Sequence, residues 1–255
     1  MVIRGALQTG NLSAGEASKL AGRLQWACQH MFRKIGRAVL RPIYNQCRSR
    51  TGKISEELRQ SLAWWEDILA EGVCENFSWY RPSGQVVHMF CDAAGDPQRV
   101  AAILWVDGDV LFSDCPPPLE ITQLWQERRD QQIMGLELLS IALGLSVFEK
   151  EIAGRKLVIH SDNTGAECCT RRGSARAFDH CSLIHQMWTH IAALGVFAWI
   201  TRVPTDDNFA DLPSRQSYDL LNAVGAEWRE PRWLGMYLDA KAWATVTNTI
   251  VGTPK

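Results

Sequence analysis

The segment VIHSDNTGA, residues Val158 to Ala166, places an aspartate directly after an apolar run. The run predicts a buried strand that ends where Asp162 is followed by Asn163 and a Thr-Gly pair. A carboxylate at such a strand end is either a turn or helix-cap residue or part of a functional site. Taken alone, Asp162 fits the turn better, so the rest of the sequence has to decide.

The patterns around this segment predict an α/β architecture. The expected elements are, in chain order, a strand at 85–95, a hairpin at 99–113, a helix at 128–150, a strand at 156–163, a long helix at 178–194, a strand at 196–203 and a short helix from Asp207. The Asp-Gly-Asp of 107–109 signals the hairpin turn. Three antiparallel strands followed by helix-linked parallel ones predict a mixed five-stranded sheet flanked by helices.

The first 72 residues have helical periodicity instead. Ser13 is expected as the N-cap of a helix, with Glu16 in the capping-box position. A second helix is expected to begin at Ser55, and Gly72 can end it. The chain is therefore divided into a helical basic segment at 1–80, the sheet domain at 81–220 and a C-terminal tail or helix at 221–255.

Charge is distributed unevenly along the chain. Residues 1–54 contain ten Lys or Arg and one acid, whereas residues 55–255 contain 17 Lys or Arg and 27 acids. A basic block suits binding to a phosphate backbone, and a solvated helical face is the alternative interpretation. The candidate backbone contacts in this block are Arg23, Arg33, Lys34, Arg37 and Arg41.

Composition places the chain among ordinary globular proteins, because 46% of its residues are hydrophobic and 22% are charged. No apolar run approaches the roughly 20 residues of a membrane helix, and residues 1–10 lack the apolar core of a secretory signal. We expect no membrane association and an intracellular location, in the cytoplasm or nucleus. The eight scattered cysteines indicate reduced thiols rather than a disulfide framework or a structural zinc site.

Four acids lie near the ends of expected strands or on expected helices. Asp92 is near the end of the first strand, Glu137 lies in an apolar helix, Asp162 ends the fourth strand and Asp211 begins the last helix. Each one singly also fits a cap, a turn or a solvent-facing position. Together they suggest a cation site, since a carboxylate in apolar surroundings loses hydration that a cation can replace.

Such a cluster has a specific chemical use. Two divalent ions about 4 Å apart, held by shared carboxylates, can activate water on one side of a phosphodiester and stabilise the departing oxygen on the other. Mg²⁺ suits this role because it prefers oxygen ligands and keeps positions for phosphate oxygens. Zinc would need His or Cys, which do not cluster with these acids.

These residues resemble a known family. Asp92 in CDAAG, Glu137 in GLELL, Asp162 in HSDNTGA and Asp211 in NFADLPSR resemble the acidic quartet of the ribonuclease H fold, in the family's order. NFADLPSR is similar to the closing N-x-A-D-x-x-S-R motif of retroelement reverse transcriptases. The upstream LAGRLQWACQHMFRKIGRAVLRPIY is similar to the helical thumb or connection segment after the polymerase palm in DIRS-like, tyrosine-recombinase retrotransposons.

The resemblance implies a metal-dependent endonuclease that cuts the RNA strand of RNA–DNA hybrids. Asp92, Glu137 and Asp162 would hold or bridge two Mg²⁺ ions, for which Mn²⁺ could substitute, and Asp211 would complete the second site. Asn163 would contact the 2′-hydroxyl that distinguishes RNA from DNA. A reverse transcriptase polymerase domain is an expected partner, because the chain contains no Y-x-D-D motif of its own.

Further contacts and other functions stay open at this point. Arg171, Arg172 and Arg176 are expected in a loop near the site, where they would either grip the hybrid or remain solvated. The alternatives to the nuclease are a catalytically inactive nucleic-acid-binding or scaffold remnant of the same fold, and another nuclease or transposase of the ribonuclease H-like superfamily.

Overall fold

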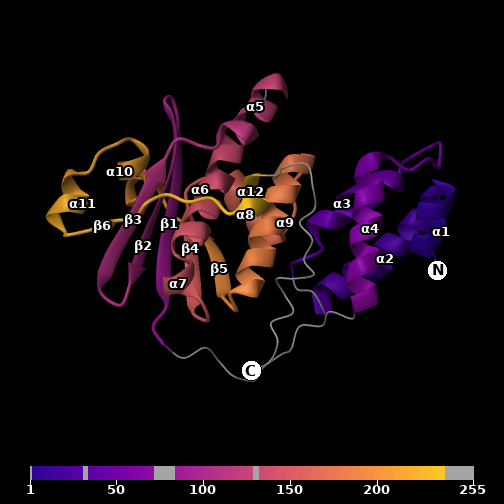
Figure 1. Ribbon diagram of the computed structural model, residues 1–255, viewed down its shortest axis with the longest axis horizontal. Coiled ribbons are helices and arrows are strands. Elements are labelled where there is room, and N and C mark those ends of the chain that lie inside the picture. The colour runs from indigo at the N-terminus through magenta and orange to yellow at the C-terminus, as the bar shows by residue number, and fades with distance from the viewer. Residues whose placement is uncertain (1, 31–33, 72–83, 129–131, 239–255) are drawn as a thin grey trace. The chain divides into compact units, whose positions relative to one another are not determined.

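The computed structural model describes residues 2–30, 34–71, 84–128 and 132–238 (Figure 1). The described residues form two compact units. One comprises Met1–Trp79 with Gly173–Thr189, and the other comprises Tyr80–Arg172 with His190–Ala240. We refer to them as the helical unit and the sheet unit. None of the described helices has both the length and the apolar content needed to cross a bilayer.

The helical unit contains the N-terminal helices that the periodicity predicts. Its elements are α1 (Val2–Thr9), α2 (Ala14–His30), the 3₁₀ helix η1 (Ala38–Leu40), α3 (Arg41–Gln46), α4 (Glu56–Glu71) and most of α9 (Phe178–Ala193). The capping box at the start of α2 is confirmed, because the Glu16 backbone N–H donates to Ser13 Oγ and the Ser13 N–H donates to the Glu16 carboxylate. Ser55 caps α4 by accepting from the Leu58 N–H. Gly72 lies outside the described residues.

The sheet unit is built on a mixed six-stranded sheet in the order β5-β4-β1-β2-β3-β6. The strands are β1 (Val87–Gly95), β2 (Gln98–Val106), β3 (Asp109–Cys115), β4 (Lys156–Ser161), β5 (Phe197–Arg202) and β6 (Glu227–Trp228). β1, β2 and β3 are antiparallel, as predicted. β4 pairs in parallel with β1, and β5 pairs in parallel with β4, also as predicted. Asp107 and Gly108 both have positive φ, which is the backbone that the two-residue β2–β3 turn requires.

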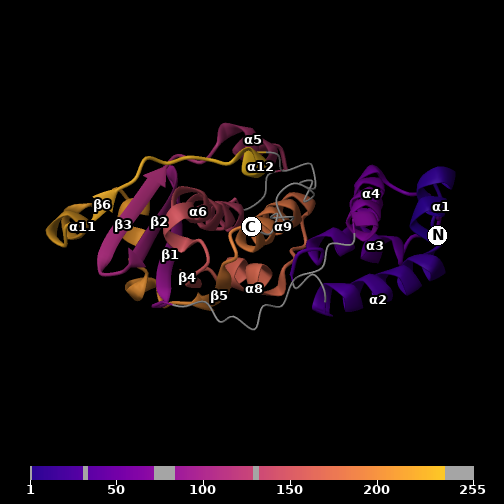
Figure 2. The same cartoon turned by 60° about the horizontal axis from the view of Figure 1, so that its bottom comes forward.

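Helices cover both faces of this sheet (Figures 1 and 2). On one face, α6 (Ile133–Val147) packs so closely that a side chain at Gly144 would meet Met89 and Ala102. On the other face, Phe90 packs in a cluster with Ala210 and neighbouring apolar residues. Successive residues of a strand point to opposite faces, so Met89 and Phe90 anchor the two layers of the core.

The remaining helices of the sheet unit are short, apart from α5 and α8. They are α5 (Leu119–Arg128), α7 (Glu149–Ile152), α8 (Thr164–Arg172), η2 (Thr205–Asp207), α10 (Asp211–Ser214), α11 (Asp219–Ala223) and α12 (Gly235–Leu238). The helix expected near Asp207 is present as η2 followed by α10. The seven described cysteines are all free thiols, in line with their scattered positions.

Three expectations were wrong. The sheet has six strands rather than five, because Glu227–Trp228 adds a two-residue strand beside β3 that is too short for any periodic signal. α5 begins at Leu119, directly after three prolines at 116–118, with the Pro118 carbonyl accepting from the Ile121 N–H, although no helix was expected between the hairpin and residue 128. The third error concerns Arg171 and Arg172, which were expected in a loop and instead form the end of α8.

Candidate metal centre

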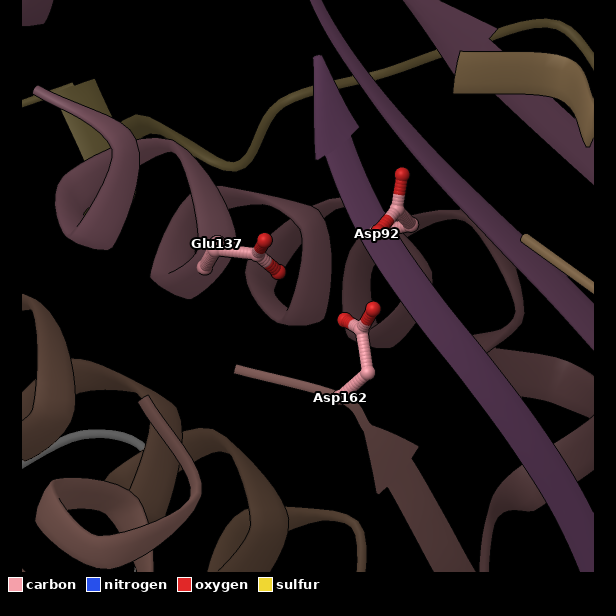
Figure 3. A group of neighbouring side chains, drawn as sticks. All are labelled: Asp92, Glu137 and Asp162. Atoms are coloured by element: carbon pink, nitrogen blue, oxygen red, sulfur yellow. The ribbon is translucent and has the colours of Figure 1, made fainter. Parts of the chain in front are cut away.

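Three of the four predicted acids converge at one edge of the sheet. Asp92, Glu137 and Asp162 each offer a carboxylate oxygen, and these oxygens lie within 4.8 Å of one another. Among the described residues this is the one group of three or more acids, histidines or cysteines spaced for a metal ion. Figure 3 shows Glu137 pointing from α6 toward the two aspartates.

The strand register brings the two aspartates together. β1 and β4 are parallel neighbours, and their pairing ends where Cys91 lies beside Ser161, the last residue of β4. Asp92 and Asp162 are the next residue on each chain, so the two carboxylates arise at the same edge. The carboxyl ends of parallel strands are where ligands bind in open α/β sheets. Asp162 therefore lies beside a second carboxylate, that of Asp92, which a simple turn residue would not require.

Glu137 is the most unusual of the three acids. Its side chain is 4% exposed, and burial, followed by repulsion from Asp92 and Asp162, raises its pKa to about 9. Its Oε2 atom is buried and accepts no hydrogen bond from the described residues. A buried carboxylate oxygen without a donor is costly unless a proton or a cation compensates it.

Asp92 is also buried, and its pKa is raised. Burial raises its pKa to about 6, and the charges of Asp162 and Asp211 add to the increase. Ser214 Oγ donates a 2.5 Å hydrogen bond to Asp92 Oδ2, which acts in the opposite direction. The Ser214 hydrogen bond therefore offsets part of the effect of burial on the pKa of Asp92.

Asn208 connects the strand ends. Its buried amide nitrogen donates to the Cys91 carbonyl at 3.1 Å, and lies 3.4 Å from Asp92 Oδ1 and 3.3 Å from Asp162 Oδ1. Asn208 and Ser214 belong to the NFADLPSR motif, but no role was predicted for either residue. The Asn and Ser of that motif were the signal from which both contacts could have been inferred.

Asp211 stands apart from the other three acids. It begins α10 as predicted, but it does not belong to the group of oxygens within 4.8 Å. Its Oδ1 accepts a 2.6 Å hydrogen bond from Arg215 Nε instead. Its charge still contributes to the raised pKa of Asp92. The expected convergence of four acids is therefore found for three.

The residues present fit a divalent cation. The three donors are all carboxylates, and oxygen donors of this kind suit Mg²⁺ or Mn²⁺ rather than zinc. The unpartnered Glu137 oxygen, and the burial that is the main cause of the raised pKa values of Glu137 and Asp92, indicate that ionised carboxylates are disfavoured in the metal-free site. A cation held by Asp92, Glu137 and Asp162 would favour their ionised forms.

Asn163 has a structural role in addition to the one predicted. Its Oδ1 accepts from the Ala166 N–H at 3.0 Å and thereby caps α8. This cap explains why a helix begins at Thr164. The half-buried side chain has its amide N–H groups left to donate, so the predicted contact with a 2′-hydroxyl stays a prediction.

The arginines after the site are placed differently from the expectation. Arg171 and Arg172 belong to the last turn of α8, and only Arg176 lies in a loop. Arg171 forms an ion pair with Glu167 at 3.0 Å, and Arg172 lies 3.6 Å from Cys169 Sγ. All three side chains are exposed.

The predicted contacts of the helical unit also differ in accessibility. Arg23 is exposed on α2, whereas Lys34 is half-buried with its ammonium 4.2 Å from the Trp188 ring centroid. Arg37 and Arg41 are half-buried. Arg33 lies outside the described residues.

Comparisons with known proteins do not assign the chain to a group. No protein-family model matches it, and a search of curated proteins finds no match. The function is therefore inferred from the residues of the site.

Proposed function

We propose that this protein is a metal-dependent endoribonuclease of the ribonuclease H type, which hydrolyses the RNA strand of RNA–DNA hybrids within a retrotransposon reverse transcriptase. The observation that carries the proposal is the convergence of the Asp92, Glu137 and Asp162 carboxylates, together with the buried Glu137 oxygen that has no hydrogen-bond partner among the described residues. Two Mg²⁺ ions, or Mn²⁺ in their place, are the proposed cofactors, and the proposed location is intracellular.

The proposed chemistry divides between the bound ions and the protein. Bound ions would activate water and stabilise the leaving oxygen of the phosphodiester. Asp92, Glu137 and Asp162 would hold them, while Asn208 keeps the two strand-end aspartates in register through its shared amide. Asp211, tied to Arg215, would orient the attacking water from outside the group of three.

The architecture is compatible with this proposal. The order β5-β4-β1-β2-β3 with a parallel β1–β4 pair, and a helix that brings an acid to the strand ends, agrees with the ribonuclease H fold that the motifs resemble. The helical unit would correspond to the thumb or connection segment. Its exposed Arg23 would contact the phosphate backbone of the nucleic acid. A polymerase domain would then be the partner that generates the hybrid.

A cleavage assay tests the proposal directly. The full chain is incubated with Mg²⁺ and an RNA–DNA hybrid labelled on the RNA strand, beside single-stranded RNA and duplex DNA of the same sequence. We expect cleavage of the hybrid RNA to leave 3′-hydroxyl and 5′-phosphate ends, and to be lost in Asp162→Asn. A wild-type protein that leaves the hybrid intact with both Mg²⁺ and Mn²⁺ contradicts the proposal, and preferential cutting of DNA would indicate another nuclease or transposase.

One observation favours the alternative of an inactive nucleic-acid-binding remnant. Asp211 is engaged by Arg215 rather than by the group of three acids. If this pair prevents catalysis, wild type will bind the hybrid without cutting it, and Arg215→Ala, which frees Asp211, will restore cleavage. Cleavage by wild type removes this alternative.

A further inference from the structure

A second concave site lies in the sheet unit, apart from the metal centre. It is a pocket of about 450 Å³ between β2, β3, β6 and α11, a size typical of small-ligand sites. Figure 1 shows these elements together at the end of the sheet opposite β5. The pocket is lined by Arg99, Phe112, Asp114, Tyr218, Asn222 and Trp228.

The floor of the pocket is a buried polar cluster. Asp114 is 6% exposed and accepts from Arg99 at 2.8 Å and from the Tyr218 hydroxyl at 2.9 Å. Burial raises the pKa of Asp114, while hydrogen bonds from Tyr218 and Trp228 and the charge of Arg99 lower it. The Arg99–Asp114 pair is close to neutral, so the pocket is a poor site for an isolated phosphate but retains directional donors and acceptors.

The walls of the pocket are aromatic. The Phe112 and Tyr218 rings lie 6.0 Å apart with an interplanar angle of 36°. Trp228 is 51% exposed, which leaves much of its indole free to contact a ligand. Asn222 is exposed at the rim, where its amide can both donate and accept. Flat aromatic walls with an amide at the edge suit a planar heterocycle that stacks and forms hydrogen bonds.

The strand register relates this pocket to the metal centre. Asp92 pairs with Ala101 on β2, and Ala101 pairs with Asp114 on β3. The three residues thus form one row across the sheet and share a face, and two strand spacings separate Asp92 from Asp114 by about 10 Å. A nucleic-acid strand advances about 3.4 Å per nucleotide along a duplex axis, so this distance is about three nucleotides.

We propose that the pocket lined by Tyr218, Asn222 and Trp228 is a nucleobase-binding site. The base would stack on Trp228 and Tyr218, and its edge would bond to Asn222. Bases of a paired hybrid face their partners, so the occupant is an unpaired base, either in a single-stranded stretch beside the hybrid or in a free nucleotide. The first source rests on the proposed function, whereas base binding itself does not.

Binding measurements in EDTA test this inference without cleavage. The full chain is titrated into a blunt RNA–DNA hybrid, into the same hybrid with an overhang of adenosines containing one 2-aminopurine, and, separately, with AMP. The variants are Trp228→Ala and Asn222→Ala, both at exposed positions. Trp199→Ala is the matched control, because Trp199 is a 65% exposed tryptophan of the same sheet that does not line the pocket.

The inference predicts tighter binding of the overhang hybrid than of the blunt one, with quenched 2-aminopurine fluorescence. Trp228→Ala should weaken overhang binding at least about fivefold, since base stacking contributes at least 1 kcal/mol by alanine substitution. Blunt-hybrid binding and the Trp199→Ala protein should be unchanged. If wild type binds AMP, Trp228→Ala abolishes that binding, and the overhang hybrid binds no more tightly than the blunt one, the pocket is assigned to free nucleotides.

Two results overturn the inference. One is wild-type protein that binds the overhang no better than the blunt hybrid and does not bind AMP. The other is a preference for the overhang that survives in both pocket variants. Cleavage of the blunt hybrid with Mg²⁺ is measured separately, so an inactive protein with a working base pocket, and an active one without it, are distinguishable outcomes.

Discussion

The hydroxyl of Ser214 donates a 2.5 Å hydrogen bond to the buried carboxylate of Asp92, joining α10 to the end of β1. Ser214 is 1% exposed and Asp92 is 5% exposed, so water does not compete for the bond. This contact holds the C-terminal part of NFADLPSR against the metal centre, while Asn208 from the same segment holds the two strand-end aspartates. The motif thus supports the acids as well as contributing one.

Removing the Ser214 hydroxyl should change the pH dependence of the site. The bond lowers the pKa of Asp92, which burial raises to about 6, so Ser214→Ala should raise that pKa further. A hydrogen bond to a charged group contributes about 1.5–3 kcal/mol, equivalent to about one to two pKa units. We expect the acid limb of the pH–rate profile of hybrid cleavage to move to higher pH by that amount. The loss of cleavage activity should be greatest below pH 7.

Ser217→Ala is the matched control, because Ser217 is an exposed serine three residues further along the chain. Its pH profile should equal that of wild type. A Ser214→Ala protein whose activity falls equally at all pH values would show that the hydroxyl acts on structure rather than on the ionisation of Asp92.

Asn208→Ala should lower the stability of the protein by removing the link between Asp92 and Asp162. The substitution removes the donor shared by the Cys91 carbonyl and the Asp92 and Asp162 carboxylates, which leaves buried acceptors without a partner. We expect a loss of about 1–3 kcal/mol in the free energy of unfolding, measured by urea denaturation. Added Mg²⁺ should recover part of this loss if the aspartates bind it. Equal stability of variant and wild type without metal would contradict the bridging role.

Glu137→Gln should stabilise the metal-free protein at alkaline pH. Between its ordinary pKa of 4.5 and its folded-state pKa of about 9, Glu137 holds a proton in the folded chain that the unfolded chain releases. Its contribution to stability is therefore complete below pH 4.5 and lost as pH rises through 9. Gln cannot ionise, so we expect the variant to have the higher Tm in EDTA at pH 9 and a flatter profile above pH 6.

The same variant should lose the stabilisation by Mg²⁺ that we expect for wild type, because it lacks one carboxylate ligand. Glu120→Gln, at an exposed position of α5, serves as the control and should leave both effects unchanged. If Glu137→Gln and wild type show the same pH slope in EDTA, Glu137 is ionised in the metal-free protein and the explanation fails.

Much of the fold was predictable because periodicity and caps are local signals. The short apolar runs of β1 to β3, with the Asp-Gly turn at Asp107 and Gly108 between the last two, indicate the antiparallel part from local sequence. β6 was not predictable, since two residues carry no period and its pairing depends on β3. α8 was missed because its basic sequence resembles a solvated loop, although Asn163 provides an ordinary cap.

The candidate site was predictable to a lesser extent. Order along the chain places Asp92, Glu137 and Asp162 on the right elements, and the parallel β1–β4 pairing brings them together. The ion pair between Asp211 and Arg215 depends on rotamers that no sequence pattern specifies. The proposed nucleobase pocket was not foreseen, because Arg99 is far in sequence from Tyr218 and Trp228 and the three residues form no motif.

Gly135 offers a final test, of how Glu137 is positioned. A Cβ at Gly135 would lie 2.5 Å from the Trp125 ring, which is 2% exposed and cannot move freely. Gly135→Ala should therefore cost about 1–3 kcal/mol of stability and displace the first turn of α6, reducing hybrid cleavage. Gly22→Ala is the control, because no atom within 4 Å opposes a Cβ there and alanine favours helix α2 by about 0.5–1 kcal/mol. Thermal denaturation and cleavage assays on both variants measure these effects, and a Gly135→Ala protein as stable and active as Gly22→Ala would show that Trp125 does not fix the position of Glu137.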